Sequence, residues 1–337
     1  MTMMKAWSWQ HYGTFDGLQP VQRPVPVPGP GEVLMRIRAN SLNQRDLMAA
    51  RGALPRKGRP DIVPLCDGAG EIVAIGEGVS QAAVGDRVIA TYFPQWIDGP
   101  LQPAHTGQTL GSDVDGLLRE YAVLPKTGLL RIPAHLDFAE AATLPCAAVT
   151  AWSALFVKGA LQAGETMLTL GSGGVSLFAI QLAKASGARV IVTTSNPERG
   201  ERLRALGADV VIDYRNDDWP QQVRALGGAD VIVENGGGGT YVKSLGAAAW
   251  HARVAIVGLI TGFHDPGGSL MPILMNDLTI RAVQVGSRAD TAALLAFMES
   301  HGLRPVIDSR HSFDKPRTAY ERLASGEAFG KVVIEYG

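Results

Sequence analysis

The residues best suited to chemistry form a glycine-rich turn at 171–176, with the sequence GSGGVS. Glycines at the first and third positions permit a tight turn and let the backbone come close to a ligand. The N–H groups at the start of a following helix carry partial positive charge, which favours a bound phosphate. The turn therefore predicts a binding site for the pyrophosphate of a dinucleotide. Its predicted contacts are Gly171, Gly173, Gly174 and Val175.

Two strands and a helix must position this turn. Apolar residues 167–170 precede it, a helical stretch continues to Ser186, and a second apolar run covers 189–193. Strand, turn, helix and strand in that order form the first half of a dinucleotide-binding unit, a context far more specific than the glycines alone. A tight turn without a ligand is the simpler alternative.

The end of the second strand indicates which nicotinamide cofactor is used. NAD enzymes normally place an acidic residue there, on the ribose 2′-hydroxyl. This chain has the small polar residues 193–195 instead, followed by Arg199. Ser195 can donate a hydrogen bond to a 2′-phosphate, and Arg199 can pair with it through two N–H groups. We therefore favour NADPH. The alternatives are that Arg199 belongs to a solvated helix face and that Glu198 keeps NADH possible.

Composition excludes several classes of protein. The chain has 337 residues, 46% of them hydrophobic, a net charge of -1 and two cysteines. This length suits two ordinary domains, and the small net charge gives no attraction for nucleic acid or anionic membranes. No apolar run reaches the roughly 18 residues of a membrane span, and residues 1–10 do not resemble a signal peptide. We expect a cytoplasmic protein that acts on a small molecule, with no nucleic-acid or membrane partner.

The pattern of strands changes along the chain. The first 120 or so residues contain short Val-rich runs separated by Gly and Pro, which is typical of a small, irregular β domain. From about Thr150, strands alternate with helical stretches, which predicts an α/β domain with a doubly wound parallel sheet. Residues 284–337 again show the pattern of the first 120 or so residues and end in a strand-like run. The strands expected in the parallel sheet are 167–170, 190–193, 210–212, 231–234, 254–257 and 279–283.

Several short motifs are distributed along nearly the whole chain. They are PGPGEV at 28–33, NQRD at 43–46, DGAGEIV at 67–73, VGDRV at 84–88, AATLP at 141–145 and GKVV at 330–333. Together with the glycine turn, they resemble the motifs of the medium-chain dehydrogenase/reductase superfamily, and within it the zinc-free quinone-oxidoreductase-like branch. The resemblance implies a GroES-like, mostly β catalytic domain, residues 1–147 and 284–337, into which a Rossmann domain, residues 148–283, is inserted, with the active site in the cleft between them. It also implies a homodimer.

The resemblance also bears on metal binding. Zinc alcohol dehydrogenases of the superfamily hold a catalytic zinc at positions that correspond here to Asn43, Cys66 and Cys146. Asn43 is a poor zinc ligand, so two thiolates remain where three protein ligands are normal, although Asp67 could supply a third. The region 92–116 has no cysteine, so the structural zinc lobe is missing too. We predict no zinc.

Asn43 is then the first candidate for a catalytic group directed at the substrate or the ribose. Without zinc, the negative charge that develops on the substrate oxygen must be met by hydrogen-bond donors or water. The alternative is that Asn43 only stabilises its local turn. The resemblance implies further cofactor contacts near the nicotinamide, the adenine and the strand ends: Thr150, Tyr214, Asn235, Gly258, Val285, Gly286 and Ser287.

Two further groups are more ambiguous. Asp46 and Arg87 suggest a structural ion pair. The aromatic residues in the loop 92–96 suggest an apolar wall for the substrate, and equally a loop that packs on its own domain or forms a dimer contact.

From the cofactor site, the substituted zinc-ligand positions and the resemblance together, we expect an NADPH-dependent reductase of quinones, enones or related carbonyls. The alternatives are a zinc-type alcohol dehydrogenase and a low-turnover NAD(P)H-binding sensor or structural protein.

Overall fold

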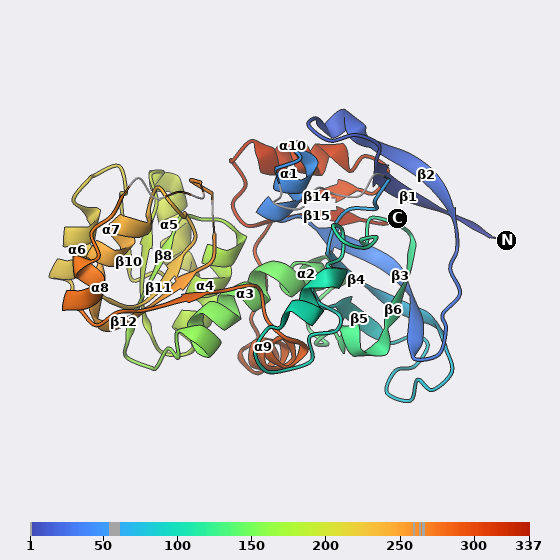
Figure 1. The fold of residues 1–337 in the computed structure, drawn as a ribbon, viewed down its shortest axis with the longest axis horizontal. Helices are drawn as coiled ribbons and strands as arrows, with labels where there is room; N and C mark the ends of the chain where they lie inside the picture. Colours follow the sequence, from blue (N-terminus) through green and yellow to red (C-terminus); the bar gives the residue numbers. More distant parts are fainter. Residues whose placement is uncertain (1, 54–60, 259, 263, 265–266) are drawn as a thin grey trace. The chain divides into compact units, whose positions relative to one another are not determined.

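The computed structural model describes residues 2–53, 61–258, 260–262, 264 and 267–337 (Figure 1). The chain divides into unit 1, residues 1–146 with 287–337, and unit 2, residues 147–286. The sequence predicts domain boundaries at 147/148 and 283/284. The first boundary in the structure lies one residue earlier than predicted, and the second lies three residues later. Unit 1 is thus built from two separated parts of the sequence. Among the described residues, no helix is long and apolar enough to cross a bilayer.

Unit 2 contains a six-stranded parallel sheet in the order β10-β9-β8-β11-β12-β13 (Figure 1). The predicted α/β class is confirmed, and each of the six predicted strands is present. Residues 190–192 of β9 are fully buried, as expected for a central strand of a sheet covered on both faces. The strands are β8 (Thr166–Leu170), β9 (Arg189–Thr193), β10 (Val210–Ile212), β11 (Ala229–Glu234), β12 (Ala248–Ile256) and β13 (Thr279–Ala282).

The order of this sheet creates a switch point between β8 and β11. After β8 the chain adds β9 and β10 on one side, and then crosses to place β11 on the other side. Ligands of doubly wound sheets bind where the connections diverge in this way. The helices of unit 2 are α3 (Val149–Trp152), α4 (Gly174–Ala185), α5 (Pro197–Leu206), α6 (Trp219–Ala225), α7 (Tyr241–Gly246) and α8 (Met271–Met275), with the π-helical turn η5 (Ser153–Lys158).

Unit 1 contains a seven-stranded sheet and a separate β1–β2 pair. The main strand order is β14-β15-β3-β4-β5-β7, with β6 also paired to β3. The strands are β1 (Met3–Trp9), β2 (Leu18–Pro24), β3 (Glu32–Ser41), β4 (Asp67–Ile75), β5 (Arg87–Ala90), β6 (Tyr121–Pro125), β7 (Leu129–Arg131), β14 (Ile307–Ser312) and β15 (Lys331–Glu335).

The last strand of this sheet joins distant parts of the sequence. β15 pairs antiparallel with β3, with Val333 opposite Ser41, so the start of β15 lies beside the residues that follow β3. The helices of unit 1 are α1 (Gln44–Ala50), α2 (Phe138–Ala142), α9 (Arg288–His301) and α10 (Arg317–Ala324). Short turns are η1 (Phe15–Gly17), η2 (Pro103–Gln108), η3 (Lys126–Gly128) and η4 (Leu144–Ala148), of which η4 continues into unit 2.

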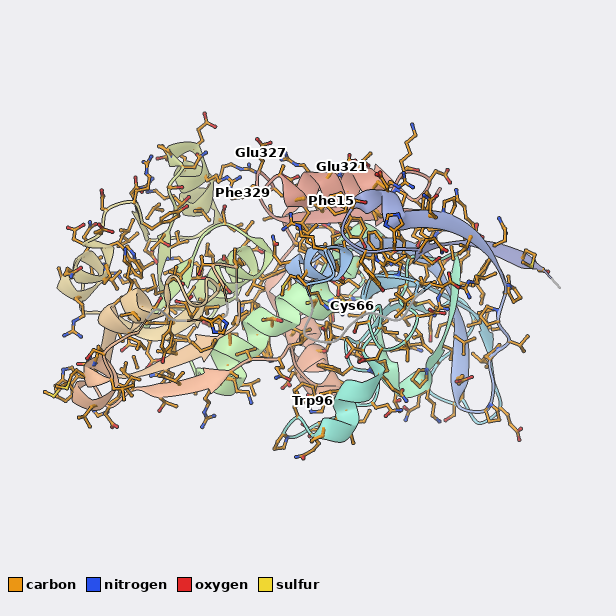
Figure 2. All side chains as sticks on the ribbon, turned by 45° about the horizontal axis from the view of Figure 1, so that its top comes forward. Phe15, Cys66, Trp96, Glu321, Glu327 and Phe329 are labelled. Atoms are coloured by element: carbon orange, nitrogen blue, oxygen red, sulfur yellow. The ribbon has the colours of Figure 1, made fainter. Side chains whose placement is uncertain are left out.

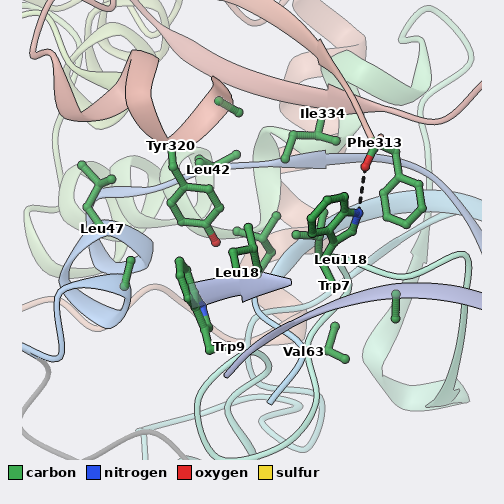
Figure 3. Packing of buried hydrophobic residues seen from close by; sticks show 14 of the residues in the cluster. Trp7, Trp9, Leu18, Leu42, Leu47, Val63, Leu118, Phe313, Tyr320 and Ile334 are labelled. Carbon is green, nitrogen blue, oxygen red and sulfur yellow. Dashed lines mark hydrogen bonds between the residues drawn. The ribbon is translucent and has the colours of Figure 1, made fainter. Parts of the chain in front are cut away.

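A buried aromatic cluster fixes this arrangement (Figure 3). The Trp7 indole Nε1 donates to the carbonyl of Phe313 at 2.9 Å, which links β1 to the residue after β14. The Trp9 and Tyr320 rings meet edge to face, with centroids 5.5 Å apart. Leu42 and Leu47 belong to the same cluster. The core therefore anchors the start of α1 against the C-terminal part of unit 1.

Candidate functional site

The glycine turn has the geometry of a phosphate-binding loop. Gly171 has φ +74, a left-handed conformation that favours glycine, and its N–H donates to the Thr193 carbonyl at 2.8 Å. Gly173 is extended and precedes α4, which begins at Gly174. A Cβ at Gly171 or Gly173 would meet no described atom within 4 Å, so the backbone of the turn is open to a ligand.

Ser176, at the position where dinucleotide-binding turns usually have their third conserved small residue, has a structural role. The Ser176 hydroxyl donates to the Leu170 carbonyl at 2.7 Å and accepts from Asn235 Nδ2 at 3.0 Å. Asn235 Nδ2 also donates to Thr169 Oγ1 at 3.1 Å, so the ends of β8 and β11 are tied together. Asn235 Oδ1 is buried and has no hydrogen-bond partner within the described part of the chain. This acceptor is suited to a hydroxyl of a bound dinucleotide.

The residues predicted to bind a 2′-phosphate lie next to the turn. Ser195 Oγ donates to the Tyr214 hydroxyl at 2.9 Å. The Arg199 guanidinium reaches back to the glycine loop and donates from Nη1 to Ser172 Oγ at 3.2 Å. Arg199 is half-buried. It is therefore not simply an exposed residue on the polar face of α5. A cation thus contacts the glycine loop, and the hydroxyls of Ser195 and Tyr214, which follow β9 and β10, pair with each other.

Sequence reasoning missed Glu234, the buried last residue of β11. One carboxylate oxygen accepts from the N–H groups of Gly236 and Gly237 at 2.8 Å and 3.0 Å, and from Thr240 Oγ1 at 2.6 Å. The other accepts from the Ser244 hydroxyl. Glu234 thus organises the loop after β11, and an acidic residue between an apolar strand and four glycines is the signal that could have identified it.

The other predicted cofactor residues lie on several different elements. A Cβ at Gly258 would lie 1.9 Å from the Asn235 carbonyl oxygen, so glycine is required for this loop contact. Thr150 is buried in α3, and Val285 has a left-handed φ of +58 directly before Gly286. Ser287 belongs to unit 1, where Ser287 Oγ accepts from the N–H of Asp290 as the cap of α9.

In unit 1, Asn43 belongs to a buried polar cluster, which we call the Asn43 cluster: Asn43, Cys66, Asp67 and Lys331. Asn43 Nδ2 donates to Asp67 Oδ2 at 2.9 Å and lies 3.9 Å from Cys66 Sγ. Lys331 Nζ donates to Asn43 Oδ1 at 2.5 Å and lies 3.7 Å from Asp67 Oδ2. Sequence reasoning did not find Lys331, because only the pairing of β15 with β3 brings it here.

Burial controls the chemistry of this cluster. It raises the pKa of Asp67 to about 6, although Lys331 and Asn43 favour the charged form and lower it. Burial also raises the pKa of the Cys66 thiol well above its usual value, and a hydrogen bond with Cys146 acts in the same direction. Cys66 lies inside unit 1, whereas Glu321 and Glu327 lie on its surface (Figure 2). At neutral pH Cys66 is therefore a thiol.

The neighbouring residues correct one expectation. Asp46 and Arg87 do not form an ion pair. An Asp46 carboxylate oxygen accepts from the Asn43 N–H at 2.8 Å as part of the α1 cap, and Arg45 Nη1 lies 3.4 Å from the other oxygen. Arg87 instead donates to the Leu136 carbonyl at 2.6 Å and lies over the Phe138 ring at 4.8 Å. The capping of a helix by the acid at its third position outweighs the pairing suggested by charge alone.

The aromatic loop packs on its own unit. The Phe93 and Trp96 side chains are buried, and their ring centroids are 6.0 Å apart. The Trp96 ring stacks on His105 within unit 1, and Trp96 Nε1 donates to the Gly99 carbonyl at 2.9 Å. Of the alternatives considered, these contacts favour packing within the domain over a substrate wall.

The residues at the zinc-ligand positions do not fit a catalytic zinc. Asn43 presents its carboxamide oxygen to the Lys331 ammonium and its nitrogen to Asp67. A metal at this carboxamide oxygen would sit against a buried positive charge, and the repulsion would be strong at low dielectric. Within the described residues, no group of three or more His, Cys, Asp or Glu could hold a metal ion.

Comparison with known proteins identifies the family. Residues 29–134 match the model of the alcohol dehydrogenase GroES-like domain, and residues 174–300 that of the zinc-binding dehydrogenases. The zinc-type alcohol dehydrogenase-like protein C1773.06c of Schizosaccharomyces pombe is 37% identical, over 95% of this chain and 96% of the relative.

Two further matches cover nearly the whole chain. The 2-methylene-furan-3-one reductase of Solanum lycopersicum is 32% identical, over 98% of this chain and 79% of the relative. A solved NAD-dependent alcohol dehydrogenase superposes with a TM-score of 0.91 and 32% identity, over 99% of this chain and 100% of that one. The chain belongs to the medium-chain dehydrogenase/reductase superfamily and is an oxidoreductase that uses a nicotinamide cofactor.

Proposed function

We propose that the chain is an NADPH-dependent reductase that transfers hydride to a quinone, an enone or a related carbonyl without catalytic zinc. The observation that carries the proposal is the Lys331 ammonium, buried among the side chains at the zinc-ligand positions. A fixed cation held there by Asn43 and Asp67 leaves the substrate oxygen to hydrogen-bond donors. The name of the tomato relative, an enone reductase, supports the substrate class.

The cofactor proposal depends on unit 2. The open backbone at Gly171 and Gly173 and the unsatisfied Asn235 Oδ1 fit a bound dinucleotide. Ser195 and Arg199 are proposed to bind a 2′-phosphate, and the position at the end of β9 has no acidic residue to repel it; the nearest acid, Glu198, is exposed in the first turn of α5. Tyr214, Gly258, Thr150 and the backbone at 285–286 are proposed as the remaining contacts.

The proposed reaction is a hydride transfer to the substrate, followed by protonation. The bound cofactor supplies the hydride. Asn43 Nδ2 donates a hydrogen bond to the substrate oxygen, where negative charge develops during the transfer; one such donor contributes on the order of 3 kcal/mol. Water supplies the proton, which suits an enolate or hydroquinone product.

A substrate panel tests the proposal. Purified protein is incubated with NADPH and quinones, enones or aldehydes, and with NADP or NAD and alcohols, and absorbance at the nicotinamide band is followed. We expect reduction of quinones or enones, and an Asn43→Ala variant should lose about 100-fold in kcat because it lacks the donor.

The outcomes separate the alternatives. Alcohol oxidation that depends on bound zinc would identify a zinc-type alcohol dehydrogenase. Turnover only at background rate, together with tight cofactor binding, would identify a sensor or structural protein. A matched variant, Val84→Glu, changes an exposed residue of unit 1 and should keep wild-type kcat.

We also propose a homodimer, formed through the outer edge of the unit 2 sheet. β13 is an edge strand whose residues Thr279, Arg281 and Ala282 are exposed. The preceding helix α8 and its cap carry four exposed apolar side chains. An unpaired edge next to apolar surface favours pairing with an identical edge across a two-fold axis. The four residues are Leu270, Met271, Leu274 and Met275.

The cytoplasm is the compartment that we propose. Cys66 and Cys146 are free thiols in contact with each other, and a reducing compartment keeps such a pair reduced.

A further inference from the structure

The Lys331 side chain is buried in a way that needs explanation. Lys331 is 3% exposed, and lysine is almost never fully buried unless it is paired. Its ammonium donates to the Leu42 carbonyl at 2.7 Å and to Asn43 Oδ1 at 2.5 Å. Its third interaction is with Asp67 Oδ2 at 3.7 Å, and Asp67 is fully buried. The ammonium therefore belongs to a fixed network rather than to a solvated surface.

This network determines the orientation of the Asn43 carboxamide. An ammonium group can only donate, and an ionised carboxylate can only accept. The carboxamide oxygen must therefore face Lys331 and the nitrogen must face Asp67, as they do. The reverse orientation would bring N–H groups against the ammonium and the oxygen against the carboxylate. Two opposite charges on two sides thus fix a side chain that would otherwise have two orientations.

One N–H group of Asn43 has only a weak partner. Asn43 Nδ2 donates to Asp67 Oδ2 at 2.9 Å, and its other contact is Cys66 Sγ at 3.9 Å. A thiol sulfur is a weak acceptor, so a carbonyl oxygen can replace it with a gain in hydrogen-bond strength. Asn43 itself is half-buried. The ammonium on Oδ1 also polarises the amide and makes its N–H groups stronger donors.

We propose that Lys331 is a positioning residue, whose ammonium holds the Asn43 carboxamide with one polarised N–H presented to the substrate oxygen. This inference rests on the proposed reductase function. Lys331 acts through Asn43 and does not touch the substrate. In this role the Lys331 ammonium does part of what a metal ion does. It strengthens the hydrogen bond from Asn43 to the developing negative charge on the substrate oxygen, although it does not touch the substrate itself.

A double-mutant cycle tests whether Lys331 acts through Asn43. Lys331→Met should lower kcat by about tenfold, because the donor is no longer fixed or polarised, with unchanged affinity for NADPH. In an Asn43→Ala background, the same change should have little further effect on kcat. Lys331→Arg should recover part of the loss. A merely structural role predicts equal losses in both backgrounds, and that result would overturn the proposal.

A matched control separates folding from positioning. Arg322→Met removes a different ion pair of unit 1, between α10 and Asp308, and should leave kcat unchanged. If Lys331→Met does not fold, Lys331→Gln makes the same comparison, since it keeps a polar side chain without the charge. Thermal melts of every variant identify losses that arise from unfolding.

A second readout does not depend on turnover. The side-chain amide ¹H and ¹⁵N resonances of Asn43, assigned with the Asn43→Ala variant, report its orientation and polarisation. We expect them to shift in Lys331→Met and to return toward wild type in Lys331→Arg. Unchanged resonances would reject the positioning role. If the resonances shift while wild-type protein reduces none of the panel, the proposed function fails and the positioning role remains.

Discussion

At the scale of the residue, Arg199 is the side chain on which cofactor choice is expected to depend. Its guanidinium donates to Ser172 in the glycine loop, and Ser195, which follows β9, pairs with the Tyr214 hydroxyl. A 2′-phosphate bound there gains charge-assisted hydrogen bonds that the NADH ribose cannot form. The position of one cation relative to the glycine turn therefore connects the local fold to cofactor preference.

The Arg199→Ala variant tests this connection. We expect kcat/KM with NADPH to fall by about tenfold or more, since hydrogen bonds to charged groups contribute about 1.5–3 kcal/mol, while kcat/KM with NADH changes little. Steady-state kinetics with both cofactors measure this. Arg202→Ala, on the exposed part of the same helix, is the matched control. Equal losses with both cofactors would show that Arg199 does not recognise the phosphate.

The sequence singles out Asn43, Ser195 and Arg199 as candidates because each is close in sequence to a recognisable motif, and their roles remain predictions. It could not predict that Lys331 meets Asn43, since 288 residues separate the two and no local pattern encodes a contact of that range. Glu234 was missed for a different reason. A buried acidic residue in a strand only interrupts the run of apolar residues, and its role is visible only in the structure, which shows the N–H groups from which it accepts hydrogen bonds.

At the scale of the element, the parallel strands were predictable and the unit 1 sheet was not. Strands such as β9 are short continuous apolar runs, because both of their faces are buried. In unit 1 the order β14-β15-β3-β4-β5-β7 mixes segments from both parts of the sequence. Sequence patterns indicate that such strands exist but carry little information on which strands become neighbours.

The contact between β14 and α10 gives a prediction about stability. Arg322 holds both carboxylate oxygens of Asp308, at 2.8 Å and 3.0 Å, and the Phe329 N–H donates to one of them at 2.9 Å. The hydrogen bonds from Arg322 lower the pKa of Asp308 to about 2. Because the pKa is lowered on folding, this stabilisation is present above the unfolded value of 3.8 and is lost as pH falls toward 2.

The Asp308→Asn variant should therefore be destabilised by about 2 kcal/mol at neutral pH. The difference from wild type should shrink between pH 4 and pH 2, as the wild-type carboxylate becomes protonated. Urea unfolding at a series of pH values measures it. Asp314→Asn, which breaks an exposed pair with Lys5, is the control and should cost less than about 1 kcal/mol. A difference independent of pH would show that the charge of Asp308 is not the source of its effect.

At the scale of the whole molecule, the proposed dimer depends on the apolar surface of α8. Leu274 is 75% exposed in the single chain. A Leu274→Glu change would place a charge in the proposed contact, so the variant should be monomeric while wild type has twice the mass of one chain. Light scattering after size exclusion measures both. A monomeric wild type, or a dimeric variant, would contradict the proposed interface.

The Asn43 cluster also gives a prediction about the metal content of the whole protein. Elemental analysis should find far less than one zinc per chain, and reductase activity should survive treatment with a chelator, because Lys331 occupies the place of a divalent cation. Addition of zinc should not raise activity. One tightly bound zinc, removed together with activity, would overturn the account of this cluster.

The pairing of β15 with β3 also sets an order of events during synthesis. Asn43 and Asp67 are made early, but Lys331 leaves the ribosome only after every residue of unit 2 has been made. Until then, Asp67 lacks its cation and Asn43 has nothing to fix its carboxamide. A chain that lacks β15 therefore lacks the contacts that Lys331 makes with Asn43 and Asp67. The Asn43 cluster is complete only after the residues of unit 2 and of β15 have been synthesised.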